Sequence, residues 1–530
     1  MSTNIKITDN YQWTNFHNNV HKQVLHRYLI FNDTSTGWKD GLKGIQEMIG
    51  QVRIRNERLR AYGGTWSLSD VGVCNDSILD SRSLLFFGTV GAGSIAGKPL
   101  FKDDPVPLSS RLFYFQSGCQ INQINNELES RGLCLPTTGA SNGQTIAGAI
   151  STGTHGSALK VGSMQDYIRA LHIVTSETQH FIIQPKSNPV VSKSFCDIFG
   201  AKMINDDSLF YSALVSFGSY GIIHALIIES VSLFMLETYC LKADYSDVEK
   251  IFSSLKNFKH SSNNNLVKFL KGFNLPDDED PFHVRLIVNP YETAQNAFIE
   301  VMYKRKLDKN KLSKEPESSD RVGNDVLSFI AIVTNSIGEA TPILMNNFVF
   351  DKVLNLQAGY TQTPRNIFGD TTHSKPDKGG ASIELGIPIK NAADAERIIS
   401  TTILQMNFMG IMGIRFVKNS KATLAFTRFS PLTCTIELVG FESERTRNFY
   451  KQVFLELDNA KIPFTLHWGQ QGDFSKKRLA VTYGDALVEW INNRNRLLPD
   501  PIQRYMFTND FLKQAGLSES PNLTGGGEIV

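Results

Sequence analysis

Residues 135–157 read LPTTGASNGQTIAGAISTGTHGS, and this stretch decides how the rest of the sequence is interpreted. Glycine, serine and threonine dominate it, and it carries almost no charge. Glycine allows a backbone to approach a ligand closely, and backbone N–H groups and hydroxyls can then donate hydrogen bonds to that ligand. A pyrophosphate suits such a stretch because it accepts many hydrogen bonds from neutral donors. The alternative is a set of surface turns, but turns seldom stay uncharged over so long a stretch.

A second glycine loop, Gly63-Gly64-Thr65-Trp66-Ser67, lies far upstream, after a strand-like run. Neither loop is a Walker loop, because no GKS or GKT follows the glycines. Neither is the dinucleotide fingerprint, which follows the first strand and opens a helix. Two glycine loops separated by roughly one subdomain suggest a ligand long enough to touch both.

The composition limits the class of protein. The chain has 530 residues, of which 41% are hydrophobic, so it can form two or three domains with large cores. Lys and Arg number 54 against 52 Asp and Glu, which argues against a nucleic-acid partner. Residues 1–13 lack a signal-peptide pattern, and polar residues interrupt the apolar stretch 221–236, which therefore predicts a buried strand and no membrane span.

The six cysteines are scattered and form no metal-type pair, so we expect no metal site. Without an export signal, they are interpreted as reduced thiols in a cytoplasmic protein. The oligomeric state is left open.

Hydrophobic periodicity predicts an α+β fold. The N-terminal region should contain an irregular lead-in from residue 14 and a helix over 38–50. Strands are then expected at 52–55, 59–62, 83–87, 111–115, 167–174 and 218–234, with a helix at 120–131. A second α+β region should contain helices at 245–258 and 391–408 and strands at 283–288, 381–388, 423–429 and 433–439, and a further helix is expected at 490–496.

Several motifs together resemble the vanillyl-alcohol oxidase family of FAD enzymes, which carry a PCMH-type FAD-binding domain. The matching segments are 60–70 with 139–157, then 206–210, 216–222, 467–470 and 506–512. The Gly-Thr-His-Gly sequence at 153–156 is the most specific of them. The nearest branch is that of the aldonolactone and alditol oxidases. The resemblance is good over about residues 50–235 and thinner, but in order, to the end.

The resemblance implies a two-subdomain FAD-binding domain over residues 14–236, an inserted α+β cap over 237–460 and a C-terminal return over 461–530. It also implies a set of FAD-binding positions. These are Tyr62, Gly63, Gly64, Thr65, Trp66 and Ser67 in the first loop, Thr138, Gly139, Ser141, Asn142, Thr145, Gly148, Ser151, Thr152, Gly153, Thr154 and His155 in the long stretch, and Gly221, Ile222 and His467 further along.

The first loop departs from the family in one position. Many members attach FAD covalently through a histidine just before the serine of this loop, where this chain has Trp66. We therefore expect noncovalent FAD. Cys134, just before the long stretch, is an alternative attachment point, although a small buried hydrophobic residue is the simpler interpretation.

Two further departures concern the substrate. The family's cap-strand Glu-x-Arg pair is Gly413 and Arg415 here, and the lysine of its His-Trp-x-Lys motif is Gln470. Arg415 could stabilise a developing alkoxide or a reduced flavin, or form a surface or interface ion pair. Glu384, among apolar residues, could be a general base with a raised pKa, or the polar side of an alternating strand.

We therefore predict an FAD-dependent oxidoreductase with Arg415, Glu384 and Gln470 as catalytic residues. Its substrate would be a small alcohol that is not sugar-like, oxidised at its CH–OH group by hydride transfer to flavin N5, with oxygen as the acceptor. One alternative is a dehydrogenase of an aldonolactone or similar substrate that uses another acceptor. Another is a flavin-binding protein without catalysis.

Overall fold

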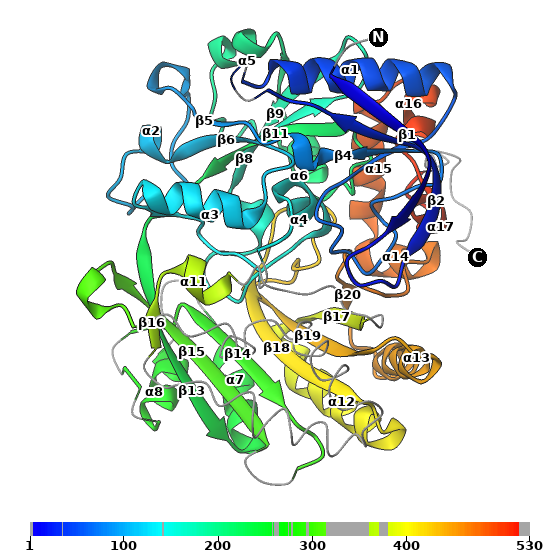
Figure 1. Ribbon diagram of the computed structural model, residues 1–530. Coiled ribbons are helices and arrows are strands. Elements are labelled where there is room, and N and C mark those ends of the chain that lie inside the picture. The colour runs from blue at the N-terminus through cyan, green and yellow to red at the C-terminus, as the bar shows by residue number, and fades with distance from the viewer. Residues whose placement is uncertain are drawn as a thin grey trace.

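The computed structural model describes residues 4–518 apart from gaps at 34, 36, 140–141, 257, 259–263, 274, 277–278, 293–295, 314–359 and 370–379. Two lobes are stacked in Figure 1. The upper lobe contains the N-terminal elements together with the C-terminal helices, and the lower lobe contains the middle of the chain. The chain thus returns to its starting lobe at its end, as the inserted-cap arrangement requires.

A four-stranded sheet begins the upper lobe, in the order β1 (Ile5–Thr14), β2 (His21–Ile30), β4 (Ser77–Asp80) and β3 (Leu59–Tyr62). Helix α1 (Lys39–Ile54) packs on it through Ile45, Met48 and Ile49. The expected irregular lead-in is wrong, because the antiparallel pairing of β1 with β2 makes strands of both segments. The expected strand at 52–55 is also wrong, since residues 52–54 complete the last turn of α1.

The second sheet of this lobe has the order β10 (Lys202–Asn205), β9 (His180–Gln184), β8 (Ile168–Val174), β11 (Ile222–Glu229), β6 (Leu112–Gln116) and β5 (Phe87–Thr89). Its helices are α2 (Leu108–Arg111), α3 (Ile121–Ser130), α4 (Ile146–Thr152), α5 (Lys193–Phe199) and α6 (Asp207–Leu214). A short ribbon pairs β7 (Leu133–Cys134) with β12 (Val231–Ser232). The strand expected at 83–87 is mostly wrong, since only Phe87 belongs to β5.

An eight-stranded sheet forms the lower lobe. Its order is β16 (Tyr360–Gln362), β13 (Phe234–Ala243), β15 (Ala297–Lys306), β14 (His283–Val288), β18 (Gly410–Lys418), β19 (Leu432–Phe441), β17 (Gly380–Pro388) and β20 (Thr465–Leu466). The helices of this lobe are α7 (Tyr245–Leu255), α8 (Asn264–Lys271), α11 (Pro364–Phe368), α12 (Ala392–Met406) and α13 (Glu444–Asn459). The strand expected at 423–429 is wrong, because that segment is a loop between β18 and β19.

The chain ends with α14 (Lys476–Tyr483), α15 (Asp485–Leu497), α16 (Pro501–Met506) and α17 (Asp510–Gln514), which lie beside the N-terminal elements (Figure 1). The α+β architecture is thus as expected. The domain limits 14–236, 237–460 and 461–530 stay a prediction.

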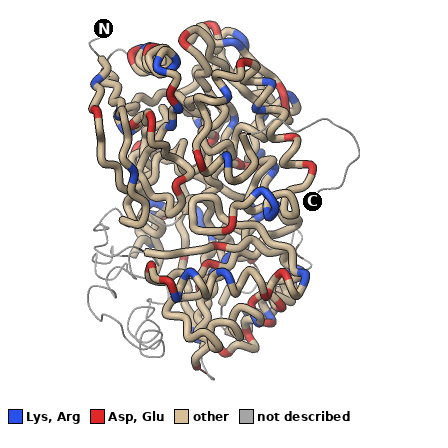
Figure 2. The backbone as a smooth tube through the Cα atoms, turned by 90° about the vertical axis from the view of Figure 1, so that its right-hand side faces the viewer, with Lys and Arg blue, Asp and Glu red and all other residues tan. Residues whose placement is uncertain are grey.

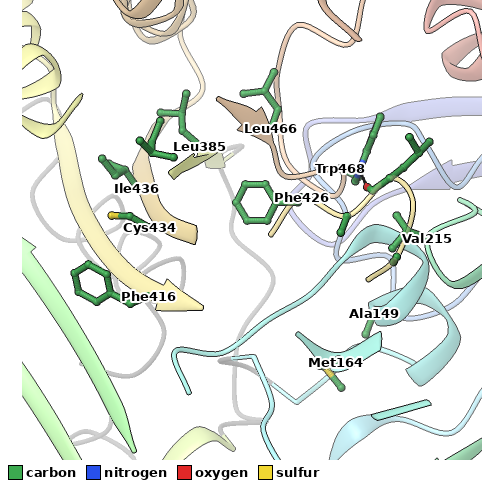
Figure 3. Close-up of a cluster of buried hydrophobic side chains, with 14 of the residues drawn as sticks. Ala149, Met164, Val215, Leu385, Phe416, Phe426, Cys434, Ile436, Leu466 and Trp468 are labelled. Atoms are coloured by element: carbon green, nitrogen blue, oxygen red, sulfur yellow. Dashed lines mark hydrogen bonds between the residues drawn. The ribbon is translucent and has the colours of Figure 1, made fainter. Parts of the chain in front are cut away.

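Aromatic residues close the junction between the lobes. Figure 3 shows Phe426 between the cap-sheet residues Leu385 and Ile436 on one side and Trp468 and the helix residue Ala149 on the other. The indole of Trp468 donates to the carbonyl of Leu424 at 2.8 Å, so the β18–β19 loop is tied to the C-terminal return.

The charged residues do not segregate by sign. Acidic and basic positions alternate along the tube in Figure 2, in agreement with the near-zero net charge. None of the helices in the described part of the chain has the length and apolar character needed to span a bilayer.

A buried histidine network lies within the second sheet. The phenol oxygen of Tyr114 is 3.2 Å from Nδ1 of His172 and 3.1 Å from Nδ1 of His224, and Nε2 of His172 is 2.9 Å from Nδ1 of His180. Burial lowers the pKa of His224 to about 3 and that of His172 well below its ordinary value. Both rings are therefore neutral in the folded protein at neutral pH.

This network predicts acid lability. Because the folded-state pKa values are depressed, the two histidines bind protons in the unfolded chain first. The free energy of unfolding should therefore fall as the pH drops from about 6.5 towards 3, by up to about 1.4 kcal/mol per pH unit for each ring. Denaturant unfolding at pH 7.5 and pH 5 should show a shallower pH dependence for His224→Gln than for the wild type. His21→Gln, at an exposed position, should leave the slope unchanged.

Candidate active site

One elongated cavity lies where the lobes meet, with about 1900 Å³ of space including its mouth. Its lining comes from both glycine loops and from the cap sheet, so the cavity suits a long ligand. It brings together nearly all the residues proposed from the sequence: Tyr62, Gly63, Gly64, Thr65, Trp66, Ser67, Thr138, Gly139, Thr145, Gly148, Ser151, Thr152, Thr154, His155, Gly221, His467, Glu384, Arg415 and Gln470.

The two glycine loops pack directly against each other. A Cβ atom on Gly63 would lie 1.9 Å from Oγ1 of Thr145, and one on Gly64 would lie 2.5 Å from the carbonyl oxygen of Gly143. A Cβ on Gly156 would be 2.5 Å from the carbonyl oxygen of Thr138. A side chain is thus excluded at these three positions, and we call the surface that the two loops form in the cavity the glycine wall.

The same wall carries polar atoms that need a partner. Oγ1 of Thr138 and Oγ of Ser117 are buried, line the cavity and have no hydrogen-bond partner among the described residues. Buried hydroxyls are normally satisfied. A close-packed glycine wall with free hydroxyls fits a long ligand with many acceptors, such as the pyrophosphate of FAD.

Four of the proposed cofactor positions are not on this wall. Ser141 lies outside the described residues. Asn142, Gly153 and Ile222 do not line the cavity. Gly153 ends α4 in the left-handed conformation, with φ of 81°, and Ile222 belongs to a hydrophobic core cluster. A structural role therefore accounts for Gly153 and for Ile222.

Trp66 lines the cavity and stacks on Phe16, with ring centroids 4.1 Å apart and an angle of 16° between the planes. Cys134 does not line the cavity. It is buried in a separate core cluster, where its thiol contacts the carbonyl of Ser232, and burial raises its pKa to about 12. The geometry therefore favours the buried-hydrophobic interpretation of Cys134 over a covalent attachment point.

Strand alternation builds the opposite wall. On β14, β15, β17, β18 and β19, one set of alternate residues packs into the main hydrophobic core, for example Leu286, Ile299, Leu385, Ile414 and Ile436. The intervening residues face the cavity. They are His283, Arg285, Glu300, Met302, Glu384, Arg415 and Glu437. Five charged side chains therefore line one buried face of the sheet.

Arg415 is the centre of this wall. Its Nη1 lies 2.8 Å from Oε2 of Glu437 and 3.2 Å from Oε1 of Glu384. Arg415 thus forms ion pairs, as one of its two interpretations proposed, but these pairs lie inside the cavity and not at the surface. Gln470 donates to Oε1 of Glu437 at 2.8 Å and accepts from Ser382 at 2.9 Å.

Glu437 occupies the region of the family's missing glutamate. It is the direct cross-strand partner of Gly413, and a Cβ atom on Gly413 would meet nothing within 4 Å. The open space at Gly413 therefore lies beside Glu437 on the neighbouring strand. The acid lost from β18 has a counterpart on β19.

His155 bridges the two walls. Its Nδ1 lies 2.8 Å from the carbonyl oxygen of Gly156 and its Nε2 lies 3.1 Å from Oε1 of Glu384. Burial alone would raise the pKa of Glu384, but the charges and hydrogen bonds of His155 and Arg415 hold it well below its usual range. The interpretation of Glu384 as a base with a raised pKa is therefore wrong.

His467 lines the same cavity. Burial, together with the nearby charges of His155 and Arg415, lowers its pKa to about 4, so the ring is neutral. The backbone N–H of Gly469 donates to its Nδ1 at 3.1 Å, which leaves the proton on Nε2. His155, Glu384 and His467 have ligand atoms within 4.8 Å of one another, a spacing that could hold a metal ion. The guanidinium of Arg415 on the same carboxylate competes with a cation, and we assign no metal.

The sequence reasoning missed Glu437, Arg285, Glu300 and His283. The signal that selected Glu384 was an acid among alternating apolar residues. The same signal is present at Glu437 in Thr-Ile-Glu-Leu-Val, at Glu300 in Phe-Ile-Glu-Val-Met and at Arg285 in His-Val-Arg-Leu-Ile. A uniform search for charges within apolar strands would have found three of the four.

Comparison with known proteins agrees with this geometry. Residues 105–181 match a family model described as "FAD binding domain". FAD as the cofactor and the resemblance to FAD-binding oxidoreductases are thereby confirmed.

Two curated relatives match parts of the chain. A putative D-arabinono-1,4-lactone oxidase of Neurospora crassa is 36% identical over 125 residues, 24% of this chain and 19% of the relative. A long-chain alcohol oxidase of an uncultured marine euryarchaeote is 35% identical over 126 residues, 22% of this chain and 21% of the relative. The matches thus span about a fifth of the length of these relatives.

The whole fold is similar to that of a solvent-stable cholesterol oxidase of known structure. The TM-score is 0.70 at 13% identity, over 97% of this chain and 98% of that chain. This likeness confirms the expected fold, an FAD-binding domain with a cap.

The packing of the glycine wall predicts how substitution affects FAD binding. Gly64→Ala places a methyl group against a backbone oxygen, so the purified variant should lose most of its bound FAD. Gly72 also lines the cavity, but a Cβ there meets nothing within 4 Å, so Gly72→Ala should retain FAD. Flavin absorbance per protein measures both. Equal flavin content in the two variants would contradict the assignment of this wall.

Proposed function

We propose that this protein is an FAD-dependent oxidoreductase that oxidises the CH–OH group of a small alcohol, with oxygen as the electron acceptor. One observation carries the proposal. A single cavity is bounded on one side by the glycine wall and on the other by the buried Arg415, Glu384 and Glu437 cluster. A redox cofactor and a hydroxyl-binding group would therefore share one cavity.

The residues of the glycine wall would hold the cofactor, with the free hydroxyls of Thr138 and Ser117 as additional donors. When bound, FAD supplies N5 as the acceptor of a hydride from the substrate carbon. Trp66 occupies the position of the usual histidyl link, and Cys134 is outside the cavity. We therefore expect the FAD to be noncovalent and released by acid precipitation.

The cap face would bind the reacting hydroxyl. Arg415 can donate to the hydroxyl oxygen, while Glu437 accepts the hydroxyl hydrogen, because the lowered pKa of Glu384 makes that carboxylate the weaker base. As the proton leaves, the guanidinium stabilises the negative charge that develops on the oxygen, and enclosure strengthens this effect. Gln470 keeps Glu437 in place through a hydrogen bond of 2.8 Å.

Gln470 is neutral, so Arg415 supplies the positive charge beside the two carboxylates of the cluster. His155 contacts Glu384 at the junction of the two walls, with 3.1 Å between its Nε2 and Oε1 of Glu384. The charge of Arg415 also favours negative charge that develops in the cavity during the reaction.

The structure changes the argument about the substrate. The absence of a glutamate at Gly413 was taken to disfavour sugar-like substrates, but Glu437 lies directly across from it. The replacement of lysine by Gln470 remains. The alternative substrate, an aldonolactone or similar compound with a non-oxygen acceptor, is therefore retained beside the small alcohol, and the Neurospora relative's name supports testing it.

The non-catalytic alternative is not favoured. Burying ionised groups costs several kcal/mol for each ion, and apolar residues of similar size often stabilise a protein better. A cavity face with five buried charged residues is thus more readily explained by a reaction than by passive binding.

The central test is Arg415→Gln on the flavin-loaded protein. With a panel of alcohols and sugar lactones, the wild type should consume oxygen and release peroxide. The variant should lose about 10²- to 10³-fold in kcat, as when one donor to a developing oxyanion is removed. The matched control is Arg478→Gln, which breaks an arginine–carboxylate pair with Asp458 on the surface, outside the cavity.

Two outcomes would change the conclusion. Turnover with an artificial dye but not with oxygen would favour the dehydrogenase alternative. Equal turnover in Arg415→Gln and Arg478→Gln would remove Arg415 from the reaction.

A further inference from the structure

A second polar cluster lies in the same cavity, beside the Arg415 cluster. It consists of His283, Arg285 and Glu300, whose relative exposures are 5%, 5% and 2%. Nη2 of Arg285 lies 2.8 Å from Oε2 of Glu300, and Nε2 of His283 lies 3.4 Å from Oε1 of the same carboxylate. Arg285 is the cross-strand partner of Arg415, so the two clusters are neighbours on one face of the sheet.

His283 has unused hydrogen-bonding capacity. Within the described part of the chain, neither of its ring nitrogens has a hydrogen-bond partner of good geometry. Burial and the charges of Arg285 and Arg415 outweigh the effect of Glu300 and lower its pKa, so the ring is neutral. A neutral imidazole offers one donor and one acceptor. Leaving such a group buried and unpaired is unfavourable.

The walls around His283 limit what can satisfy it. Phe368 lies against the ring, with centroids 5.7 Å apart, and Met302 is the cross-strand neighbour. Both line the cavity, and neither has an N–H or O–H group on its side chain. Among the described residues only the carboxylate of Glu300, at 3.4 Å, lies near a ring nitrogen of His283, so a group bound in the cavity is the partner that this ring can take.

Charge selects the kind of partner. Arg285 and Glu300 neutralise each other at 2.8 Å. An anion beside Arg285 would also meet Glu300, and a cation beside Glu300 would also meet Arg285. A neutral group that both donates and accepts hydrogen bonds meets no such conflict, and a hydroxyl is the simplest group of this kind.

We propose that His283, Arg285 and Glu300 form a second subsite, which binds a hydroxyl group of the substrate other than the one that is oxidised. The substrate is then a compound with at least two hydroxyls, and a simple monoalcohol leaves the subsite unsatisfied. This inference rests on the proposed function, because it places the reacting hydroxyl at Arg415. It also revises the sequence-based expectation of a substrate that is not sugar-like.

The test compares pairs of substrates with the flavin-loaded protein. Each pair is a linear primary alcohol and a diol of the same chain length, from four to twelve carbons. A site built to hydrogen-bond a hydroxyl discriminates strongly against the analogue that lacks it. The wild type should therefore prefer the diol at least tenfold in kcat/KM at the best chain length.

Three variants complete the design. His283→Phe keeps a ring of similar size and should abolish the diol preference through a raised KM for the diol, with little change for the monoalcohol. His283→Gln keeps a donor and an acceptor and should restore part of the preference. Cys240→Ala changes the cross-strand partner of Glu300 outside the cavity and should behave as the wild type.

Binding provides a readout besides turnover. Calorimetric titration of each pair into protein whose flavin has been chemically reduced measures affinity without reaction. Diol-selective binding without turnover of any alcohol would contradict the proposed function and leave the subsite supported. Three results would overturn the subsite. The first is a kcat/KM or an affinity that differs less than twofold between the alcohol and the diol of each pair. The second is no binding of either member of any pair, and the third is an equal loss for alcohol and diol in His283→Phe.

Discussion

Strand alternation in the cap sheet is the constraint on which the site depends. Each strand must bury one face in the hydrophobic core, so the intervening residues are forced to the other face. In this chain those residues include Arg285, Glu300, Glu384, Arg415 and Glu437, and the face they share is enclosed by the FAD-binding lobe. Buried charges persist only when they are paired. Each guanidinium accordingly lies against at least one carboxylate.

The glycine wall obeys a complementary constraint. Its two loops come from distant parts of the chain and approach so closely that Gly63, Gly64 and Gly156 leave no room for a Cβ atom. One wall therefore presents backbone and hydroxyl groups, while the other presents charged side chains. The first suits a long, acceptor-rich cofactor, and the second suits hydroxyl groups. His155 joins them, because it lies in the glycine-rich stretch and contacts Glu384 of the cap.

The sequence allowed the glycine wall to be predicted in detail, since the residues that build it lie in two short segments of unusual composition.

Less of the cap face could be predicted from the sequence. Arg415 and Glu384 were found one at a time, but their pairing depends on the strand order β18-β19-β17, which brings together residues far apart in the chain. For the same reason Glu437 was missed, although it is the direct cross-strand partner of Gly413. One of the two interpretations of Glu384, a general base with a raised pKa, is wrong because it considers burial without His155 and Arg415. The β1–β2 pair was missed because each strand is recognisable mainly through its partner.

The claim that one cavity joins a flavin to a hydroxyl-oxidising face is tested most directly by anaerobic mixing. Purified, flavin-loaded protein is mixed with the alcohols and lactones without oxygen or any other acceptor, and the visible flavin absorbance is followed. The account predicts that at least one of these compounds bleaches the flavin in a single turnover and that admitted oxygen restores the colour. Flavin that stays oxidised with every compound, although firmly bound, would contradict the account.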